Sequence, residues 1–153
     1  MVSTALPILL IEDDELDYEL IARTLQGAAR CYELTVARDG RAALDLLRPH
    51  NGNRPYFPAL ILLDLKLPRM DGLEFLRALR LDPGLRGCIV FVLTNSTADA
   101  DKLAAYQCCA AGYILKSDLA SNTGKLLDLL EAYYEVVEFP PLALPRLEAA
   151  RKI

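Results

Sequence analysis

The sequence predicts an α/β fold built around a parallel β-sheet, because two patterns alternate along the chain. Five short aliphatic runs have the length of strands, and the segments between them carry apolar residues at helical spacing. The runs hold few polar residues, as expected of strands that are buried on both faces of a sheet. Such alternation joins parallel strands by right-handed crossovers, and five strands in this pattern fit the doubly wound, flavodoxin-like order 2-1-3-4-5 with five helices.

The expected strands are short and largely aliphatic: residues 8–11, 34–37, 59–63, 89–93 and 112–115. The expected helices each carry an apolar stripe: residues 16–25, 40–47, 72–81, 99–109 and 119–137. Turn residues separate these elements, with Asp39 before the second helix and Asp82 after the third. Asp71 and Asp99 stand where a side chain would cap the start of a helix.

The length and composition are those of one globular domain, with 153 residues of which 53% are hydrophobic and 25% charged. The alternating pattern spans residues 1–138, whereas residues 139–153 contain three prolines and are expected to form a tail. The net charge of −4 argues against nucleic-acid binding, which favours a basic face. Without a basic leader or a run of about 18 apolar residues, we expect a cytoplasmic protein with no membrane partner.

The cysteine and histidine residues do not point to a metal site or to a catalytic site. The four cysteines lack the paired CxxC spacing of a zinc site and are expected to be buried thiols of a reducing compartment. The single histidine, His50, lies in a polar loop. A catalytic triad and a histidine-rich metal site are therefore not expected.

Polar and charged side chains follow the first, third, fourth and fifth expected strands: Glu12, Asp13, Asp14, Asp64, Thr94 and Lys116. In an open α/β sheet the site lies beyond the carboxyl ends of the strands, at the switch point beside strands one and three. Clustered carboxylates repel one another unless a cation neutralises them, and Mg²⁺ suits one or two carboxylates with waters and a phosphate oxygen. The sequence therefore predicts a Mg²⁺ site at this edge.

The chemistry expected at this edge is transfer of a phosphoryl group to a side chain. The sequence has neither a Walker A loop nor a GxGxxG loop, so the phosphate is expected to come from another molecule. A carboxylate can be the nucleophile and form an acyl phosphate. Lys116 and the hydroxyl of Thr94 would then stabilise charge on the transferring group.

Four segments carry a family resemblance: LLIEDDE, LILLDLKLPRMDG, VFVLTNS and AGYILKS. In this order they resemble the receiver domain of two-component response regulators, over roughly residues 8–137. The resemblance implies that Asp64 accepts the phosphoryl group. It also implies that Glu12 and Asp13 organise Mg²⁺, together with Asp64 and the backbone carbonyl of Lys66.

The resemblance further assigns a switch to two side chains, with Thr94 as the switch hydroxyl and Tyr113 as the rotating aromatic. Lys116 corresponds to the lysine of the family, and Pro68 and Gly72 fit the loop after the acceptor. Ser117 departs from the pattern, because the family usually has a proline there, in a cis peptide. The geometry of the Lys116–Ser117 peptide is therefore left open.

The partners implied are those of a phosphoacceptor rather than an enzyme: a sensor histidine kinase, and a downstream protein reached by contact or by phosphotransfer. The LDLKLPRMDG, VLTNS and YILKS segments and the proline-broken tail resemble single-domain regulators paired with bacterial phytochrome histidine kinases. Two alternatives remain open, a pseudo-receiver scaffold that never takes phosphate and a phosphatase with an Asp nucleophile. The second is disfavoured because Lys66 stands where a DxD motif requires aspartate.

A homodimer is also expected, through the fourth helix, fifth strand, last helix and tail. Several residues are expected to extend the apolar surface of the last helix beyond one stripe: Tyr133, Tyr134, Val136, Val137 and Phe139. Leu142, Leu144 and Leu147 lie in the tail, whose prolines stop it from continuing the helix. The alternative is a tail that folds back on its own domain.

Overall fold

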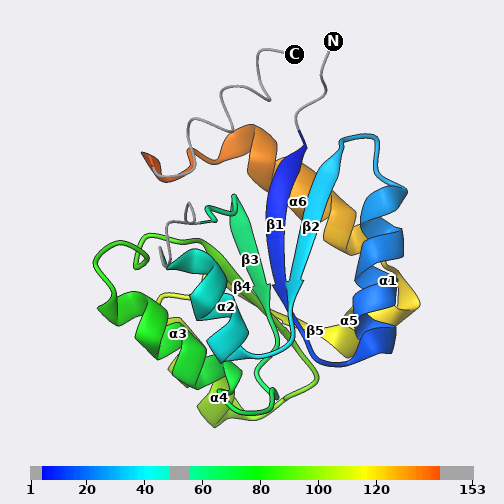
Figure 1. The fold of residues 1–153 in the computed structure, drawn as a ribbon. Coiled ribbons are helices and arrows are strands. Elements are labelled where there is room, and N and C mark those ends of the chain that lie inside the picture. Colours follow the sequence, from blue (N-terminus) through cyan, green and yellow to red (C-terminus); the bar gives the residue numbers. More distant parts are fainter. Residues whose placement is uncertain (1–4, 49–55, 142–153) are drawn as a thin grey trace.

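The computed structural model describes residues 5–48 and 56–141, in which five strands and six helices alternate (Figure 1). The elements are β1 (Leu6–Ile11), α1 (Glu15–Gln26), β2 (Tyr32–Ala37), α2 (Gly40–Leu47), β3 (Leu60–Leu63), α3 (Gly72–Leu81), β4 (Val90–Thr94), α4 (Asp99–Gln107), β5 (Gly112–Leu115), α5 (Lys116–Ser121) and α6 (Gly124–Val136). All strand pairs are parallel and the order is β2-β1-β3-β4-β5. The predicted flavodoxin-like fold is confirmed.

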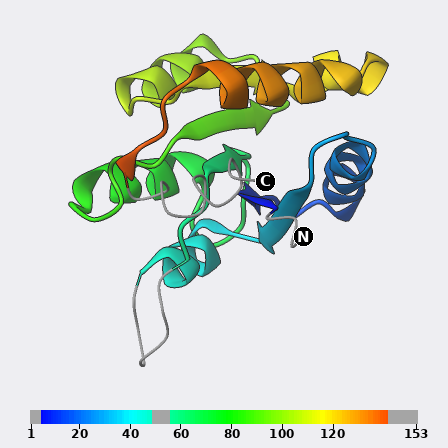
Figure 2. The same ribbon diagram turned by 90° about the horizontal axis from the view of Figure 1, so that it is seen from above.

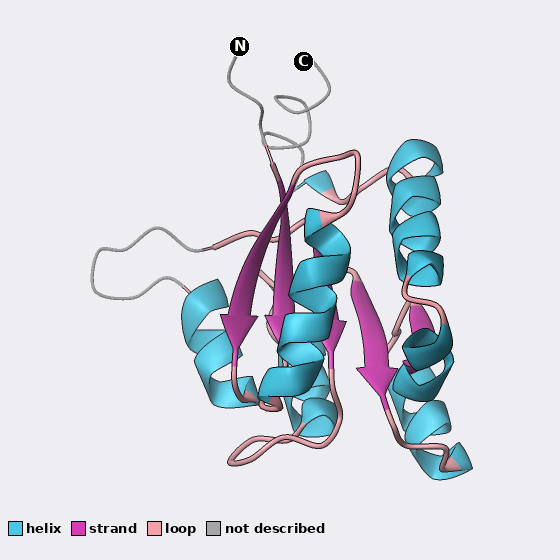
Figure 3. Cartoon of the chain, turned by 90° about the vertical axis from the view of Figure 1, so that its right-hand side faces the viewer, coloured by secondary structure: helices cyan, strands magenta, loops and turns pink. Residues whose placement is uncertain are grey.

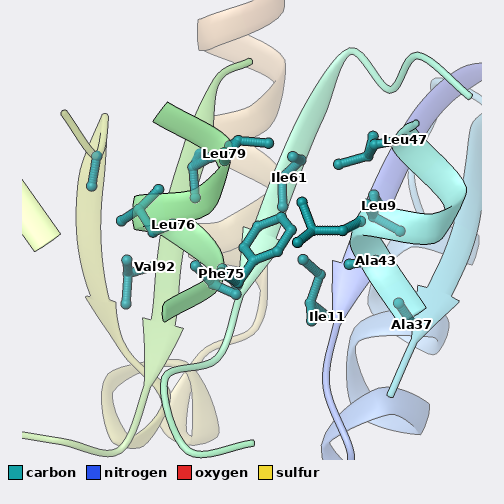
Figure 4. Close-up of a cluster of buried hydrophobic side chains, with 14 of the residues drawn as sticks. Leu9, Ile11, Ala37, Ala43, Leu47, Ile61, Phe75, Leu76, Leu79 and Val92 are labelled. Atoms are coloured by element: carbon teal, nitrogen blue, oxygen red, sulfur yellow. The ribbon is translucent and has the colours of Figure 1, made fainter. Parts of the chain in front are cut away.

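Successive residues of the central strands supply two separate hydrophobic cores. In β1, Leu9 and Ile11 face α2, α3 and α4, whereas Ile8 and Leu10 face α1, α5 and α6. Figure 2 shows α3 and α6 on opposite sides of the sheet. Figure 4 shows the first core, with the ring of Phe75 between the β-sheet and the two helices α2 and α3. Burial on both faces explains why β1, β3 and β4 are uninterrupted apolar runs.

The register of the sheet brings the carboxyl ends of the strands to one edge, where the arrows in Figure 3 end together. Ile11, the last residue of β1, lies opposite both Ala37 of β2 and Leu63 of β3. Thr94 of β4 lies opposite Leu115 of β5. The residues that follow these positions in the chain are therefore neighbours at this edge, which we call the carboxyl edge.

Aspartates cap three of the helices at this edge. The side chain of Asp14 accepts hydrogen bonds from the first turn of α1, Asp39 does so for α2, and Asp71 does so for α3. The prediction for Asp71 is confirmed, but that for Asp99 is wrong. Ala98 holds the N-cap position of α4 without a side-chain bond, and the hydroxyl of Ser96 accepts from its N–H at 3.3 Å instead.

The predicted last helix over residues 119–137 is two helices, α5 and α6, so the expected total of five is wrong by one. The break falls at Asn122, whose backbone is extended and whose side-chain oxygen accepts from the N–H of Gly124 at 3.0 Å. Asparagine offers such local bonds in competition with the helix, and glycine favours a helix boundary. Within the described segments, each helix is too short or too polar to cross a membrane.

Two other expectations about burial are wrong. In α1 only Ile21, Thr24 and Leu25 are buried, whereas Leu16, which belongs to the apolar stripe of the sequence, is 76% exposed. The four cysteines are free thiols, two exposed and two half-buried, so the prediction that they are buried does not hold.

Helix α4 buries little of its surface and is held mainly at its carboxyl end. Within α4, Ala105 is its single buried residue. At the carboxyl end, the guanidinium group of Arg80 on α3 donates to the carbonyl oxygens of Cys108 at 2.7 Å and Cys109 at 2.9 Å. Because Arg80 also bonds the carbonyls of Arg86 and Cys88, it clamps the end of α4 to the segment leading into β4.

The chain after α6 turns back on its own domain as far as it is described. Phe139 is buried against Leu6, Ala59 and Tyr134, and its ring meets that of Tyr133 edge to face at 5.8 Å. Phe139 and Tyr134 therefore belong to the interior of the domain rather than to the exposed surface expected of them. Val136 is 81% exposed. The predicted contacts of Leu142, Leu144 and Leu147 lie outside the described residues.

Candidate functional site

Three carboxylates meet at the carboxyl edge, from Glu12, Asp13 and Asp64. One oxygen of each lies within 4.8 Å of the others. Backbone hydrogen bonds place them, because the N–H of Glu12 donates to Ala37 and the N–H of Asp64 donates to Ile11. Glu12 and Asp64 are buried, whereas Asp13 is exposed. This set of hard oxygen ligands, open to solvent on one side, fits a divalent cation that keeps several waters.

Lys116, at the start of α5, faces this cluster with its ammonium group. Its nitrogen lies near four carboxylate oxygens: Asp17 Oδ2 at 2.7 Å, Glu12 Oε1 and Oε2 at 3.0 Å each, and Asp64 Oδ2 at 3.1 Å. Burial alone would lower the pKa of Lys116, but the hydrogen bonds that it donates to Asp17 and Glu12, and the charge of Asp64, outweigh that effect and raise the pKa. Lys116 is therefore a fixed positive charge beside Asp64.

Glu12 is harder to ionise than an ordinary glutamate. Burial raises the pKa of Glu12 to about 8, with the charge of Asp64 adding to the effect and Lys116 opposing it. At neutral pH a proton therefore competes with a metal cation for Glu12, and a bound cation would displace that proton.

Thr94 and Tyr113 are joined through one residue of the loop between β4 and α4. The buried hydroxyl of Thr94 lies 3.4 Å from the backbone nitrogen of Ser96. The hydroxyl of Tyr113 donates to the carbonyl oxygen of Ser96 at 2.9 Å, and Ser96 Oγ donates to Asp101 Oδ2 at 2.5 Å. A movement of Thr94 would therefore reach Tyr113 through the Ser96 backbone.

Lys66 lies on the open side of the site. Its N–H points to Asp64 Oδ1 at 3.4 Å, and its ammonium group, largely exposed, lies 3.8 Å from Asp101 Oδ2. The predicted role of its carbonyl oxygen as a cation ligand stays a prediction. Asp101, like Asp17, was not identified from the sequence.

The loop from Asp64 to α3 approaches the acceptor backbone so closely that it needs a glycine. A Cβ atom on Gly72 would lie 2.2 Å from the carbonyl oxygen of Asp64. The loop is also tied to α2, because Arg69, whose φ of 61° is left-handed, pairs with the buried carboxylate of Asp39 at 2.8 Å. The position of Asp64 thus depends on contacts outside the acidic cluster. Pro68 lies in the same loop, as expected.

The Lys116–Ser117 peptide is trans, as are the other peptides of the described residues. Helix α5 begins at Lys116 directly after β5, with Ser117 in its first turn. The question that Ser117 left open in the sequence is thereby answered for this structure.

Residues 8–130 match the response regulator receiver domain, and the chain belongs to that family. Response regulator Rcp1 of Synechocystis is 36% identical over 136 residues, which cover 87% of this chain and 92% of Rcp1. The probable methanogenesis regulatory protein FilR2 of Methanothrix harundinacea is 35% identical over 127 residues, covering 83% of this chain and 82% of FilR2.

Solved structures agree with this assignment. The phosphorylated cyanobacterial phytochrome response regulator RcpA superimposes with a TM-score of 0.79 at 32% identity, covering 89% of this chain and 99% of that one. The Mn²⁺-bound form of Rcp1 gives a TM-score of 0.78 at 34% identity, covering 88% and 98%. The predicted resemblance to phytochrome-associated regulators is confirmed. Mn²⁺ in that relative and the three carboxylates here agree with a divalent cation site.

Gly72→Ala tests the close approach at the acceptor loop. Because the added methyl group would overlap backbone atoms of Asp64 and Leu65, we expect a loss of about 2 kcal/mol or more in unfolding free energy. Gly87→Ala is the matched control, since a Cβ there meets no described atom within 4 Å. Urea unfolding of both variants is the measurement, and equal midpoints would contradict the crowding at Gly72.

Proposed function

We propose that this protein is a phosphoacceptor switch of a two-component phosphorelay, in which Asp64 receives a phosphoryl group from a sensor histidine kinase. The observation that carries the proposal is the setting of Asp64. Its carboxylate is buried between two further carboxylates and the ammonium group of Lys116, 3.1 Å away. This setting combines a nucleophile, a place for a cation and a fixed positive charge in one site.

In the transfer step, a carboxylate oxygen of Asp64 attacks the phosphorus of a phosphohistidine. The new P–O bond forms as the P–N bond breaks, and the electron pair of that bond stays on the imidazole nitrogen. Lys116 lies where it can donate to an oxygen of the incoming phosphoryl group. Mg²⁺, when held by Glu12, Asp13, Asp64 and the Lys66 carbonyl, supplies further neutralisation of charge.

The switch follows from the contacts around Ser96. After transfer, the hydroxyl of Thr94 turns toward a phosphoryl oxygen and leaves the Ser96 nitrogen. Tyr113 then exchanges its bond to the Ser96 carbonyl for the space that Thr94 vacates. These are two arrangements of the same groups, and the phosphoryl group stabilises the second because only that one satisfies its oxygens.

The partners follow from the family and its relatives. RcpA is a cyanobacterial phytochrome response regulator, and we extend that pairing to this chain as a bacterial phytochrome kinase acting on Asp64. Output runs through protein contact or transfer of the phosphoryl group to a further protein, in the cytoplasm. Residues 1–138 form the receiver domain, to which the buried Phe139 also belongs, and the rest of residues 139–153 form a tail that serves as a dimer arm.

Asp64→Asn tests the acceptor. The amide has nearly the shape of the carboxylate but is not a nucleophile, so labelling by acetyl phosphate and Mg²⁺ is expected to disappear while the fold is kept. Intact mass detects the added phosphoryl group, and Asp118→Asn, an exposed change of the same kind, should be labelled normally. Labelling of Asp64→Asn at the wild-type rate would show that the acceptor is another residue. An inert wild-type chain would favour a pseudo-receiver, and phosphate release without an adduct a phosphatase.

Asp13→Ala tests the cation site. Removing one of three clustered carboxylates is expected to weaken Mg²⁺ binding about tenfold or more, because few protein ligands are available. Glu15→Ala removes an exposed carboxylate close by and serves as the control. Calorimetric Mg²⁺ titration gives both affinities, and an unchanged affinity in Asp13→Ala would rule out its role as a ligand.

The homodimer is proposed on the surface formed by α4, β5 and α6, where Leu103, Tyr106 and Val136 are exposed. Leu103→Glu should shift the chain toward monomer, because a charge in an apolar interface is costly. Leu81→Glu places the same charge on an exposed leucine of α3, and the oligomeric state measured by light scattering should stay that of the wild type. Truncation after Pro141 keeps the buried Phe139 and should also favour monomer. Light scattering decides, and a monomeric wild type at tens of micromolar ends the proposal.

A further inference from the structure

The shortest contact of the Lys116 ammonium group is with Asp17, at 2.7 Å. An ammonium group has three protons, and four carboxylate oxygens share them here. Two of the partners, Glu12 and Asp64, also belong to the carboxylate cluster that fits a cation. Asp17 does not belong to that cluster, so among the described residues it is the partner of Lys116 with no competing ligand role.

The backbone fixes Asp17 in this position. It lies in the first turn of α1, and its N–H donates to the capping carboxylate of Asp14 at 3.1 Å. Its side chain points from α1 across to α5, where Lys116 is the first residue. The contact therefore joins two helices that begin at the same edge of the sheet.

The packing of Lys116 is incomplete on that side. The space between α1 and α5 is a cavity of about 160 Å³, lined largely by apolar residues of both helices and of the sheet, together with Glu12, Asn95 and Ser117 and with Asp17 and Lys116 themselves. A side chain beside such a space loses the contacts that would otherwise hold its conformation. The ion pair with Asp17 thus adds to the packing that holds the Lys116 side chain, which is 13% exposed.

We propose that Asp17 is a positioning residue, which holds the Lys116 ammonium group beside Asp64 while Glu12 and Asp64 are engaged by the cation and the phosphoryl group. The inference rests on the proposed function of Asp64 and extends it to a residue of α1. Because Asp17 binds Lys116 from outside the cluster, the lysine keeps one anchor and has protons left for a phosphoryl oxygen.

Asp17→Asn tests this inference in the full chain. The amide keeps the size of the side chain but lacks its charge, so labelling by acetyl phosphate at saturating Mg²⁺ should slow about tenfold, near the lower end of what hydrogen bonds between charged groups contribute. Beryllofluoride, a phosphoryl mimic, should bind about tenfold more weakly. The affinity for Mg²⁺ should change less than twofold. Glu15→Gln removes a charge from the same turn without touching Lys116 and should behave as wild type.

A double-mutant cycle separates the positioning of Lys116 by Asp17 from general effects of the substitution on the fold or on the electrostatic potential of the site. In a Lys116→Met background, Asp17→Asn should cause no further loss in labelling or in beryllofluoride affinity, because its effect runs through the ammonium group. Equal labelling of wild type and Asp17→Asn overturns the inference alone, as do losses that add in the double variant. A wild-type chain that takes neither a phosphoryl group on Asp64 nor beryllofluoride overturns the proposed function together with the inference.

Discussion

The parallel register of β1 against β3 is the constraint on which the site depends. Because Ile11 lies opposite Leu63, the residues that follow the two strands must be neighbours, and these are Glu12, Asp13 and Asp64. Carboxylates at such short range repel one another, and two of the three are buried. The fold therefore creates an unfavourable electrostatic arrangement at one edge, and the rest of the site compensates for it.

Lys116 provides part of that compensation. It follows β5, the strand at the far edge of the sheet, and its ammonium group nevertheless reaches Asp64, which follows β3. One ammonium group faces three clustered carboxylates, and burial, with the charge of Asp64 adding to it, still raises the pKa of Glu12. The site thus retains an affinity for further positive charge, which is the property a cation-dependent acceptor of phosphoryl groups requires.

The sequence allowed the sheet and the acidic edge to be predicted for a physical reason. Strand periodicity is local, and the carboxyl ends of parallel strands share an edge whatever their side chains are. The same reasoning missed Asp17, because its role depends on how α1 and α5 are placed across a cavity. A signal was present in the acidic run EDDELD, whose last member lies one helical turn from the cap at Asp14.

Other misses have the same origin. The sequence around Phe139 does not show whether its side chain lies exposed in a tail or buried in a core. Its burial depends on residues as distant in the chain as Leu6. Likewise Asp99 has the residue type of a cap, but Ser96 bonds the N–H of Ala98 before α4 begins. Tertiary contacts determine the burial of Phe139 and the N-cap of α4, and patterns in a single sequence carry no information about such contacts.

The sparse anchoring of α4 has a consequence for the energy landscape of the domain. A helix that buries little apolar surface can detach at a lower free-energy cost than global unfolding, because the sheet and its cores stay intact. The clamp by Arg80 restrains the carboxyl end of the helix, whereas near the other end Asp101 is held by one hydrogen bond from Ser96 and by the exposed Lys66. The low-cost excursion is therefore an opening from that other end. The domain therefore combines a rigid frame with one cooperative unit of low local stability.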